Sequence, residues 1–362
     1  MPKIKVLIVD DSSVIRSIVR EVLKQDNLIE VVGEAEDPLV ARDLIKELNP
    51  DVITLDVEMP KMDGITFLKN LMRLRPMAVV MLSTLTTKGA EITLEALELG
   101  AIDFIAKPSV EDLIINRDSF KNTLLDKIKY AATVDLKSYQ LNHAITRVEQ
   151  TRVLSFTGAK RSNHIIAIGA STGGTEAIKT LLPMLPNNAP PVVIAQHIPK
   201  AFSTSFANRL NTLCTVQVLE AHHGQKIKEG HVYIAPGDMH LKVASKGGAL
   251  FCLLEDSELV NRHKPAVDVL FDSLLEVASN VQAVLLTGMG KDGAKGMLNL
   301  KKAGAKTIIQ DQKSSLIWGM PGGAFELNAH CEQYPLTDIA KNILKFAALD
   351  RKEMKEVMYE YQ

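Results

Sequence analysis

The amino-acid sequence predicts two α/β domains joined by a linker, on three observations. The chain has 362 residues, which is enough for about two average domains. From residue 4 onward, apolar β-branched runs alternate with amphipathic helical stretches, the pattern of a parallel sheet covered by helices. This alternation fades in the polar stretch 131–163 and resumes at His164. We therefore expect domains at 1–130 and 164–349, a linker at 131–163 and a charged tail at 350–362.

The composition excludes several classes of protein. The formal net charge is -1 without a clustered basic excess, so we expect no nucleic-acid partner. Cys214, Cys252 and Cys331 are widely spaced, which predicts neither a disulfide framework nor a paired zinc site and is typical of a reducing cytoplasm. No apolar run approaches the roughly 20 residues of a membrane span. We expect a cytoplasmic protein that does not insert into a membrane, and nothing in the sequence calls for more than a monomer.

The first domain is predicted to contain five strand–helix units. The strand runs with their following helices are IKVLIVD and SVIRSIVREVLK, VVGEAE and PLVARDLIKEL, DVITLD and GITFLKNLMRL, AVVMLS and AEITLEALELG, and DFIAKP with a helix that ends near Tyr130. Such a series predicts a doubly wound parallel sheet of the flavodoxin-like type. A sheet of this kind binds its ligand beyond the carboxyl ends of its strands.

Ionisable side chains stand at three of these strand ends. Asp10 and Asp11 close the first strand, Asp56 closes the third and Lys107 closes the fifth. Three carboxylates at one edge would repel one another, and a divalent cation, most naturally magnesium, relieves that repulsion. Asp56 is then the candidate phosphoryl acceptor. The alternative is helix capping, by Asp11 or Ser12 for the first helix, but the convergence of all four ionisable groups favours a functional site.

The first domain also resembles the receiver domain of two-component response regulators, over residues 4 to about 125. The motifs that carry the resemblance are IVDDSSVIR, LDVEMPKMDG, MLST and IAKPS. The roles implied by this resemblance are the phosphorylation site Asp56, the metal ligands Asp10, Asp11, Asp56 and the Glu58 backbone carbonyl, and the switch residues Ser83, Phe104 and Lys107.

The second domain begins with the same alternation and adds a different element. Its predicted elements are the strand IIAIGA, a helix to Leu182, PVVIAQH, a helix over AFSTSFANRLN, TVQVLEA, an antiparallel excursion over HVYIAPGDMHLKV and ALFCLLED, the helix AVDVLFDSLLEVA, the strand QAVLLTG, the helix DGAKGMLNLKKAG and the strand KTIIQD. This series predicts a second doubly wound, mainly parallel α/β domain with an antiparallel excursion.

The glycine turn in HIIAIGASTGGTEAI could hold a phosphate or present a nucleophile. A dinucleotide-binding fingerprint needs a glycine where Ser171 stands, and an acidic residue at the end of the next strand, where the chain has His197. Both requirements fail, so a nucleotide-binding regulator is disfavoured. The turn does satisfy GxSxG, in which small neighbours expose a serine on a sharp strand-to-helix turn.

Three residues at the ends of different strands could form a catalytic triad. Ser171 would need a base, His197 ends the next strand, and Asp292 follows QAVLLTG where it could hold the second imidazole nitrogen. Their order along the chain differs from that of α/β-hydrolases, but triads are defined by role. The alternative is that each residue merely caps a helix or ends a strand; the three together favour catalysis.

The second domain is similar to the catalytic domain of chemotaxis response regulators of the protein-glutamate methylesterase family. The similar motifs are GASTGG, AQHIPKAFSTSFANRLN, HVYIAPGDMHL, KPAVDVLF, LLTGMGKDGAKG and WGMPGGA. With the receiver, the resemblance covers residues 4 to 348. It implies hydrolysis of γ-glutamyl methyl esters on the cytoplasmic helices of chemoreceptors, with release of methanol, and deamidation of glutamine at the same sites. It also implies a chemotaxis histidine kinase as phosphodonor.

This resemblance assigns roles to the site residues of the second domain. Ser171 attacks the ester, His197 transfers the proton, and Asp292 orients the imidazole. The backbone N–H of Thr172 is the mechanistic expectation for an oxyanion donor, and Met289 is the matching contributor in the family. The domain order suggests that the unphosphorylated receiver covers the cleft at Ser171. The alternative function is a phosphorylation-controlled binding module without catalysis; a DNA-binding output is disfavoured because no basic helix-turn-helix follows the receiver.

Overall fold

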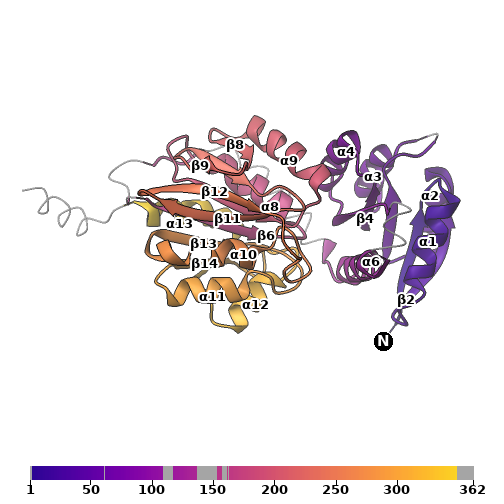
Figure 1. Cartoon of the computed structure of the whole chain (residues 1–362). Helices are drawn as coiled ribbons and strands as arrows, with labels where there is room; N and C mark the ends of the chain where they lie inside the picture. The colour runs from indigo at the N-terminus through magenta and orange to yellow at the C-terminus, as the bar shows by residue number, and fades with distance from the viewer. Residues whose placement is uncertain are drawn as a thin grey trace, which may run out of the picture. The chain divides into compact units, whose positions relative to one another are not determined.

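The computed structural model describes residues 2–60, 62–108, 117–136, 153–156, 161 and 163–348. Within them, no helix is long and apolar enough to cross a membrane. The chain forms two compact units, Met1–Leu141 and Asn142–Gln362 (Figure 1). Their division falls inside the stretch 131–163. Most of that stretch and all of 350–362 lie outside the described residues, so the linker, the domain boundaries and the charged tail stay predictions.

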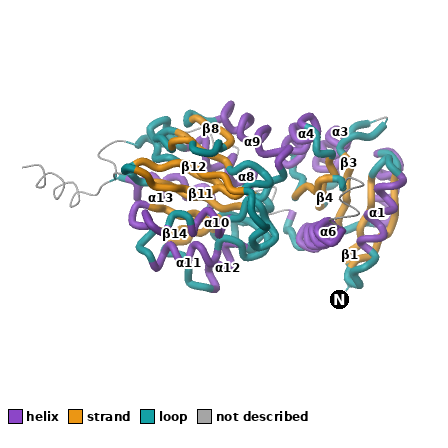
Figure 2. Tube along the Cα trace, in the orientation of Figure 1, coloured by secondary structure: helices purple, strands orange, loops and turns teal. Residues whose placement is uncertain are grey.

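The first unit alternates strands and helices along the chain (Figure 2). Its elements are β1 (Ile4–Val9), α1 (Ser13–Leu23), β2 (Ile29–Ala35), α2 (Pro38–Leu48), β3 (Val52–Asp56), α3 (Gly64–Leu74), β4 (Ala78–Ser83), α4 (Thr87–Glu98), β5 (Asp103–Ala106) and α6 (Arg117–Ala131). The strands lie in the order β2-β1-β3-β4-β5, and all neighbours are parallel. The flavodoxin-like sheet is therefore confirmed, with β1 and β3 side by side where the strand order reverses.

Side-chain caps begin four helices of this unit, with Thr86 as the cap of α4. The cap of α1 shows which of the two adjacent residues Asp11 and Ser12 serves that helix. Ser12 Oγ accepts the Ile15 N–H at the start of α1, and Asp37 and Asp63 cap α2 and α3 in the same way. Ser12 rather than Asp11 is therefore the cap of α1. The helix start does not consume the Asp11 carboxylate, which is left for the strand-end pocket.

The second unit has a longer series of elements. They are β6 (Ile165–Ala170), α8 (Gly174–Leu181), η1 (Leu182–Met184), β7 (Val192–Gln196), α9 (Lys200–Leu213), β8 (Gln217–Glu220), β9 (Gln225–Lys226), β10 (His231–Ile234), β11 (His240–Lys246), β12 (Ala249–Glu255), α10 (Val267–Asp272), η2 (Leu275–Asn280), β13 (Val281–Leu285), α11 (Ala294–Lys302), β14 (Lys306–Gln310), α12 (Met320–Glu326), β15 (Glu332–Tyr334) and α13 (Leu336–Ala347).

The main sheet of the second unit is parallel and has one reversal of strand order. Its order is β15-β14-β13-β6-β7-β10-β8, and each neighbouring pair is parallel. From β6 the chain proceeds to β7 on one side, whereas β13 leads to β14 and β15 on the other. The carboxyl ends of β6 and β13 therefore border the crevice in which a doubly wound sheet places its site.

The antiparallel excursion is present, but the sequence assigns one strand to it wrongly. The small antiparallel sheet has the order β11-β12-β9, whereas HVYI forms β10, which lies between β7 and β8 in the main sheet. Val232, Tyr233 and Ile234 are all buried. Consecutive burial of this kind is typical of an interior parallel strand, and a four-residue apolar run alone does not reveal its partners.

A buried apolar cluster joins the main sheet to the layer formed by α10, α11 and the small sheet. Tyr233 of β10, Leu241 of β11, Phe271 of α10 and Met297 of α11 belong to this cluster and are almost wholly buried. Aromatic and long aliphatic side chains supply most of the area removed from water there. This packing fixes α10 over the sheet close to the carboxyl end of β6.

Strand β6 carries a glycine where α10 begins. A Cβ atom on Gly169 would lie 2.2 Å from Val267 Cγ1 and 3.0 Å from Leu285 Cδ1. Contacts of 2.2 Å between carbon atoms do not occur in folded proteins, so any side chain at this position must displace the start of α10 or the Val267 side chain.

We predict that Gly169→Ala lowers the free energy of unfolding of the second unit by roughly 1–3 kcal/mol through overpacking. Urea unfolding followed by the fluorescence of Trp318, the single tryptophan of the chain, measures the change. Removing the clashing methyl groups in Gly169→Ala/Val267→Ala should recover part of the loss. A single variant as stable as the parent protein would refute the close approach.

Candidate active site and phosphorylation site

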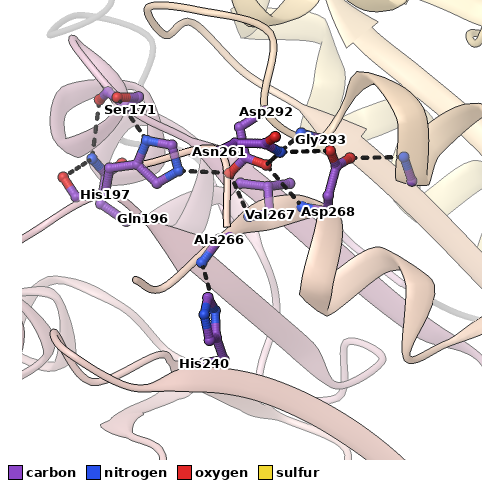
Figure 3. Close-up of polar contacts among 11 residues, drawn as sticks. Ser171, Gln196, His197, His240, Asn261, Ala266, Val267, Asp268, Asp292 and Gly293 are labelled. Atoms are coloured by element: carbon purple, nitrogen blue, oxygen red, sulfur yellow. Dashed lines mark hydrogen bonds and ion pairs between the residues drawn. The ribbon is translucent and has the colours of Figure 1, made fainter. Parts of the chain in front are cut away.

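Three polar side chains converge at the carboxyl edge of the main sheet in the second unit. Ser171 directly follows β6, His197 directly follows β7, and Asp292 lies between β13 and α11. Figure 3 shows their side chains joined in one line of hydrogen bonds. The structure therefore brings together the three residues that the sequence predicts as a triad, from strands on both sides of the reversal.

The distances define which nitrogen of the histidine faces which neighbour. His197 Nδ1 lies 3.1 Å from Ser171 Oγ, and His197 Nε2 lies 2.9 Å from Asp292 Oδ2. Because an ionised carboxylate only accepts hydrogen bonds, Nε2 must carry the proton toward Asp292, and the neutral ring then has an unprotonated Nδ1. That nitrogen can accept the Ser171 proton. The geometry is that of a serine nucleophile with a positioned base.

Asp292 is buried and surrounded by donors. Its Oδ2 accepts from His197 Nε2 and the Val267 N–H at 2.7 Å, and its Oδ1 accepts from Asn261 Nδ2 at 2.7 Å and from the N–H groups of Asp268 and Gly293 at 3.2 and 3.1 Å. Burial by itself raises the pKa of this carboxyl, but the hydrogen bonds led by His197 outweigh it and lower the pKa to about 2. Asp292 therefore keeps its negative charge throughout the neutral pH range.

Two glycines shape the turn that exposes the nucleophile. Gly173 has φ +75, a conformation that glycine adopts without steric cost, and α8 begins directly after it. A Cβ atom on Gly288 would lie 2.8 Å from Ser171 Cβ, so the β13 loop can approach the serine only with a glycine at 288. The Ser171 N–H itself donates to the Thr287 carbonyl at 3.1 Å, which fixes the turn against that loop.

Sequence reasoning missed several residues that hold this site. Gln196 Nε2 donates to the backbone carbonyls of Ser171 and His197 at 3.0 and 3.3 Å, tying nucleophile and base together. Asn261 and Asp268 contact the Asp292 carboxylate. The KPAVDVLF motif did mark the segment of Asp268, but no spacing rule connects that segment to Asp292, because the contact spans 24 residues between different elements.

The two predicted oxyanion donors lie near the nucleophile. Thr172 is buried beside Ser171, and its carbonyl accepts from Thr287 Oγ1 at 3.1 Å. Met289 follows Gly288, which lies against Ser171. The assignment of their N–H groups to an oxyanion stays a prediction.

The carboxyl ends of β1, β3 and β5 form the second candidate site, in the first unit. Lys107 Nζ lies 2.9 Å from Asp10 Oδ2 and 2.8 Å from Asp56 Oδ1. One oxygen from each of Asp10, Asp11 and Asp56 lies within 4.8 Å of the others. A cluster of three carboxylates fits a hard divalent cation such as Mg²⁺, and the predicted residues are therefore placed together.

Asp56 is the carboxylate whose charge is least compensated. Burial, followed by the neighbouring Asp10 carboxylate, raises the pKa of Asp56 to about 6, although Lys107 acts in the opposite direction. The Glu58 N–H contributes only a long hydrogen bond to Asp56 Oδ1, at 3.4 Å. A cation bound by these carboxylates would compensate their negative charge.

Two of the three predicted switch residues, Ser83 and Phe104, lie on the neighbouring strands β4 and β5; the third, Lys107, is the lysine of the carboxylate cluster. Ser83 ends β4, and its hydroxyl accepts from Thr93 Oγ1 at 2.7 Å and lies 3.3 Å from the Gly89 carbonyl, so it is engaged with α4. Phe104 of β5 is buried, with Lys127 Nζ 5.3 Å from its ring centre. Their roles in switching stay predictions.

The fold and the two sites define a class of protein: a mainly parallel α/β domain with a Ser–His–Asp arrangement at its carboxyl edge, preceded by a receiver-type domain. Comparison with known families agrees, because residues 166–343 match the CheB methylesterase family and residues 6–117 match the response regulator receiver domain. The crystal structure of the Thermotoga maritima CheB methylesterase catalytic domain is similar with a TM-score of 0.50 at 37% identity, covering 52% of this chain and 100% of that chain.

Full-length relatives cover nearly the whole chain. A protein named protein-glutamate methylesterase/protein-glutamine glutaminase 2 from Saccharophagus degradans is 50% identical, over 96% of this chain and 99% of the relative. A protein-glutamate methylesterase/protein-glutamine glutaminase from Hydrogenovibrio crunogenus is 48% identical, over 95% of this chain and 99% of the relative. The chain belongs to the protein-glutamate methylesterase/protein-glutamine glutaminase family, and the family resemblance seen in the sequence is confirmed.

The raised pKa of Asp56 predicts a stability change in metal-free solution. Because the folded pKa of about 6 exceeds the ordinary aspartate value of 3.8, the folded first unit loses stability as the pH rises between these values and stays less stable above them, by up to about 3 kcal/mol. Asp56→Asn should therefore raise the free energy of opening of β3 at pH 8 by roughly 1–3 kcal/mol, with no gain at pH 4.

Hydrogen–deuterium exchange of β3 peptides in the full-length protein with EDTA measures this effect, because variant and parent are compared at one pH. Asp43→Asn, on the exposed face of α2, is the matched control and should change little. Slower exchange at pH 4 but not at pH 8 would contradict the assignment.

Proposed function

We propose that this protein is a phosphorylation-activated hydrolase that removes methyl groups from γ-glutamyl methyl esters of chemoreceptor cytoplasmic domains, releasing methanol, and also deamidates receptor glutamines. The observation that carries the proposal is the line of hydrogen bonds from Ser171 through His197 to Asp292. The names of the full-length relatives give the substrate class. The proposed reaction takes place in the cytoplasm, where these receptor domains lie, and a monomer is sufficient for it.

The proposed chemistry follows from the orientation of the imidazole. Ser171 Oγ attacks the ester carbonyl while its proton passes to His197 Nδ1. Asp292 accepts the Nε2–H and stabilises the imidazolium that forms. The bond to the methoxy group then breaks, and the leaving oxygen takes the proton from Nδ1, which gives methanol and an acyl-enzyme. Water repeats the sequence: its oxygen bonds to the acyl carbon as its proton passes to Nδ1, the acyl–Oγ bond then breaks, Ser171 recovers the proton from Nδ1, and the glutamate carboxyl group is released.

The same residues serve deamidation. A glutamine side chain presents an amide carbonyl in place of the ester, and the Nδ1 proton goes to the departing nitrogen, which leaves as ammonia. In both reactions a negative charge develops on the carbonyl oxygen, for which we propose the backbone N–H groups of Thr172 and Met289 as donors.

The first unit is proposed to control this activity. Asp56 would accept a phosphoryl group from a chemotaxis histidine kinase, with Mg²⁺ held by Asp10, Asp11, Asp56 and the Glu58 carbonyl. The metal, when bound, compensates the charge of the phosphoryl group, and Lys107 already lies between Asp10 and Asp56. Ser83 and Phe104 would relay the change to a contact that blocks Ser171 in the unphosphorylated protein.

We predict that methanol release from a methyl-esterified receptor cytoplasmic fragment increases when a small-molecule phosphodonor and Mg²⁺ are added, and that Ser171→Ala abolishes it with and without the phosphodonor. The serine hydroxyl is the proposed nucleophile, so alanine leaves no group to acylate. Ser245→Ala, exposed on β11, is the control. Near-normal release by Ser171→Ala would refute the mechanism, and no release by the parent protein would favour a binding module.

We predict that Asp292→Asn lowers kcat on the order of 10⁴-fold. The asparagine amide would face Nε2 with a donor, so the ring would keep its proton on Nδ1 and could not accept the proton of Ser171. Steady-state methanol release measures the loss. Asp272→Asn, at the end of α10 where it bonds Asn299, is the matched control and should stay within about twofold, since no step uses it. A comparable loss in both variants would point to misfolding of α10 instead.

A further inference from the structure

The Asp292 carboxylate faces a second buried carboxylate across a single amide group. Asn261 Nδ2 donates to Asp292 Oδ1 at 2.7 Å and to Asp268 Oδ2 at 2.8 Å. The other oxygen of Asp268 accepts the Gly296 N–H at 2.7 Å. Figure 3 shows the Asn261 side chain between the two acids. The amide group therefore lies between two buried carboxylates and donates a hydrogen bond to each of them, where like charges would otherwise face one another.

The backbone that carries Asn261 is held in an uncommon conformation. Asn261 and Arg262 have φ +53 and +70, a left-handed region that non-glycine residues seldom occupy. The turn is closed by a pair of hydrogen bonds between the backbones of Val260 and His263, at 3.1 and 2.9 Å. Asparagine adopts this region more readily than most residues, and on this backbone the Asn261 amide reaches Asp292.

A buried histidine anchors the segment at both ends. His240 Nε2 lies 2.9 Å from the Glu258 carbonyl, and His240 Nδ1 accepts the Ala266 N–H at 3.2 Å. Because Nδ1 accepts, Nε2 must be the protonated nitrogen. The side chain of His240 is fully buried. The segment 258–266 is therefore tied to β11, and the turn cannot shift without breaking one of these bonds.

The same turn also contacts the base directly. The His263 ring stacks on the His197 ring, with centres 3.6 Å apart and planes inclined by 15°. Asn261 and His263 thus contact the two members of the His197–Asp292 pair. The Asn261 amide bonds the Asp292 carboxylate, and the His263 ring stacks on the His197 imidazole.

We propose that Asn261 is a positioning residue of the esterase. By tying Asp292 Oδ1 and keeping the Asp268 charge apart, it directs Oδ2 at His197 Nε2 and so leaves Nδ1 aligned with Ser171. The inference rests on the proposed function for its kinetic test, but the underlying geometry has a test of its own. Asn261 does not contact the reacting atoms in this arrangement, so its loss acts through the His197–Asp292 pair.

The kinetic test uses the full-length protein and the methyl-esterified receptor fragment. Asn261→Ala should lower kcat by roughly 10- to 100-fold, the loss that is typical when the hydrogen-bond partner of a metal-ligating side chain is removed. KM should stay within about twofold. The isosteric Asn261→Asp should be worse, because it places a third carboxylate in the cluster. Leu259→Ala, exposed beside the turn, is the matched control and should retain full activity.

A rescue variant separates positioning from folding. In the single variant Asp268→Asn, the new amide N–H group faces the donor N–H of Asn261. In the double variant Asn261→Ala/Asp268→Asn, this conflict is absent, and so is the repulsion between the carboxylates of residues 268 and 292. The double variant should therefore lose less than the product of the two single losses. Three results would overturn the proposal: a loss in the double variant that equals the product of the two single losses, a loss that lies wholly in KM, or a kcat of Asn261→Ala within twofold of the parent.

The geometric test needs no substrate. In protein labelled with ¹⁵N-histidine, the Nε2–H resonance of His197, identified by its loss in His197→Gln, should move and exchange faster with water in Asn261→Ala but not in Leu259→Ala. An unchanged resonance would overturn the proposal. If the parent protein releases no methanol while this resonance behaves as expected, the proposed reaction fails and the positioning role stands.

Discussion

The catalytic arrangement depends on the hydrogen bonding of one buried carboxylate, that of Asp292. Its two oxygens accept five hydrogen bonds, from the start of α10, from Gly293, from Asn261 and from His197. This saturation makes burial of a negative charge tolerable. Because the carboxylate only accepts hydrogen bonds, the neutral imidazole must carry its proton on Nε2. The other nitrogen, Nδ1, which faces Ser171, is then able to accept a proton.

The first unit uses a buried strand-end aspartate in the opposite way. Asp56 has Lys107 and one long backbone hydrogen bond as partners, together with the Asp10 charge, and its pKa is raised to about 6. Asp292, with its full set of donors, has a pKa of about 2. A carboxylate of constant charge suits the orientation of a base, whereas an undercompensated one suits a group that binds a cation and accepts a phosphoryl group. The two parallel sheets thus place similar residues at similar edges for different chemistry.

Sequence reasoning could place residues at strand ends but could not resolve their long-range partners. Ser171, His197 and Asp292 were predictable because parallel strands converge at one edge. The contacts of Asn261, Gln196 and His240 were not predictable, since they join segments distant in sequence. The strand HVYI was assigned to the wrong sheet because its apolar run carries no information about its neighbours. The capping ambiguity between Asp11 and Ser12 needed the observed Ser12 bond to the Ile15 N–H.

The protonation of His197 near pH 8 tests the central claim most directly. In ¹⁵N-histidine-labelled protein, the nitrogen chemical shifts of this ring distinguish a protonated from an unprotonated nitrogen. The account predicts a neutral ring with the proton on Nε2, toward Asp292, and a bare Nδ1, toward Ser171. A ring protonated on Nδ1 alone would contradict it, because the nitrogen beside the serine would then have no capacity to accept the proton that nucleophilic attack releases.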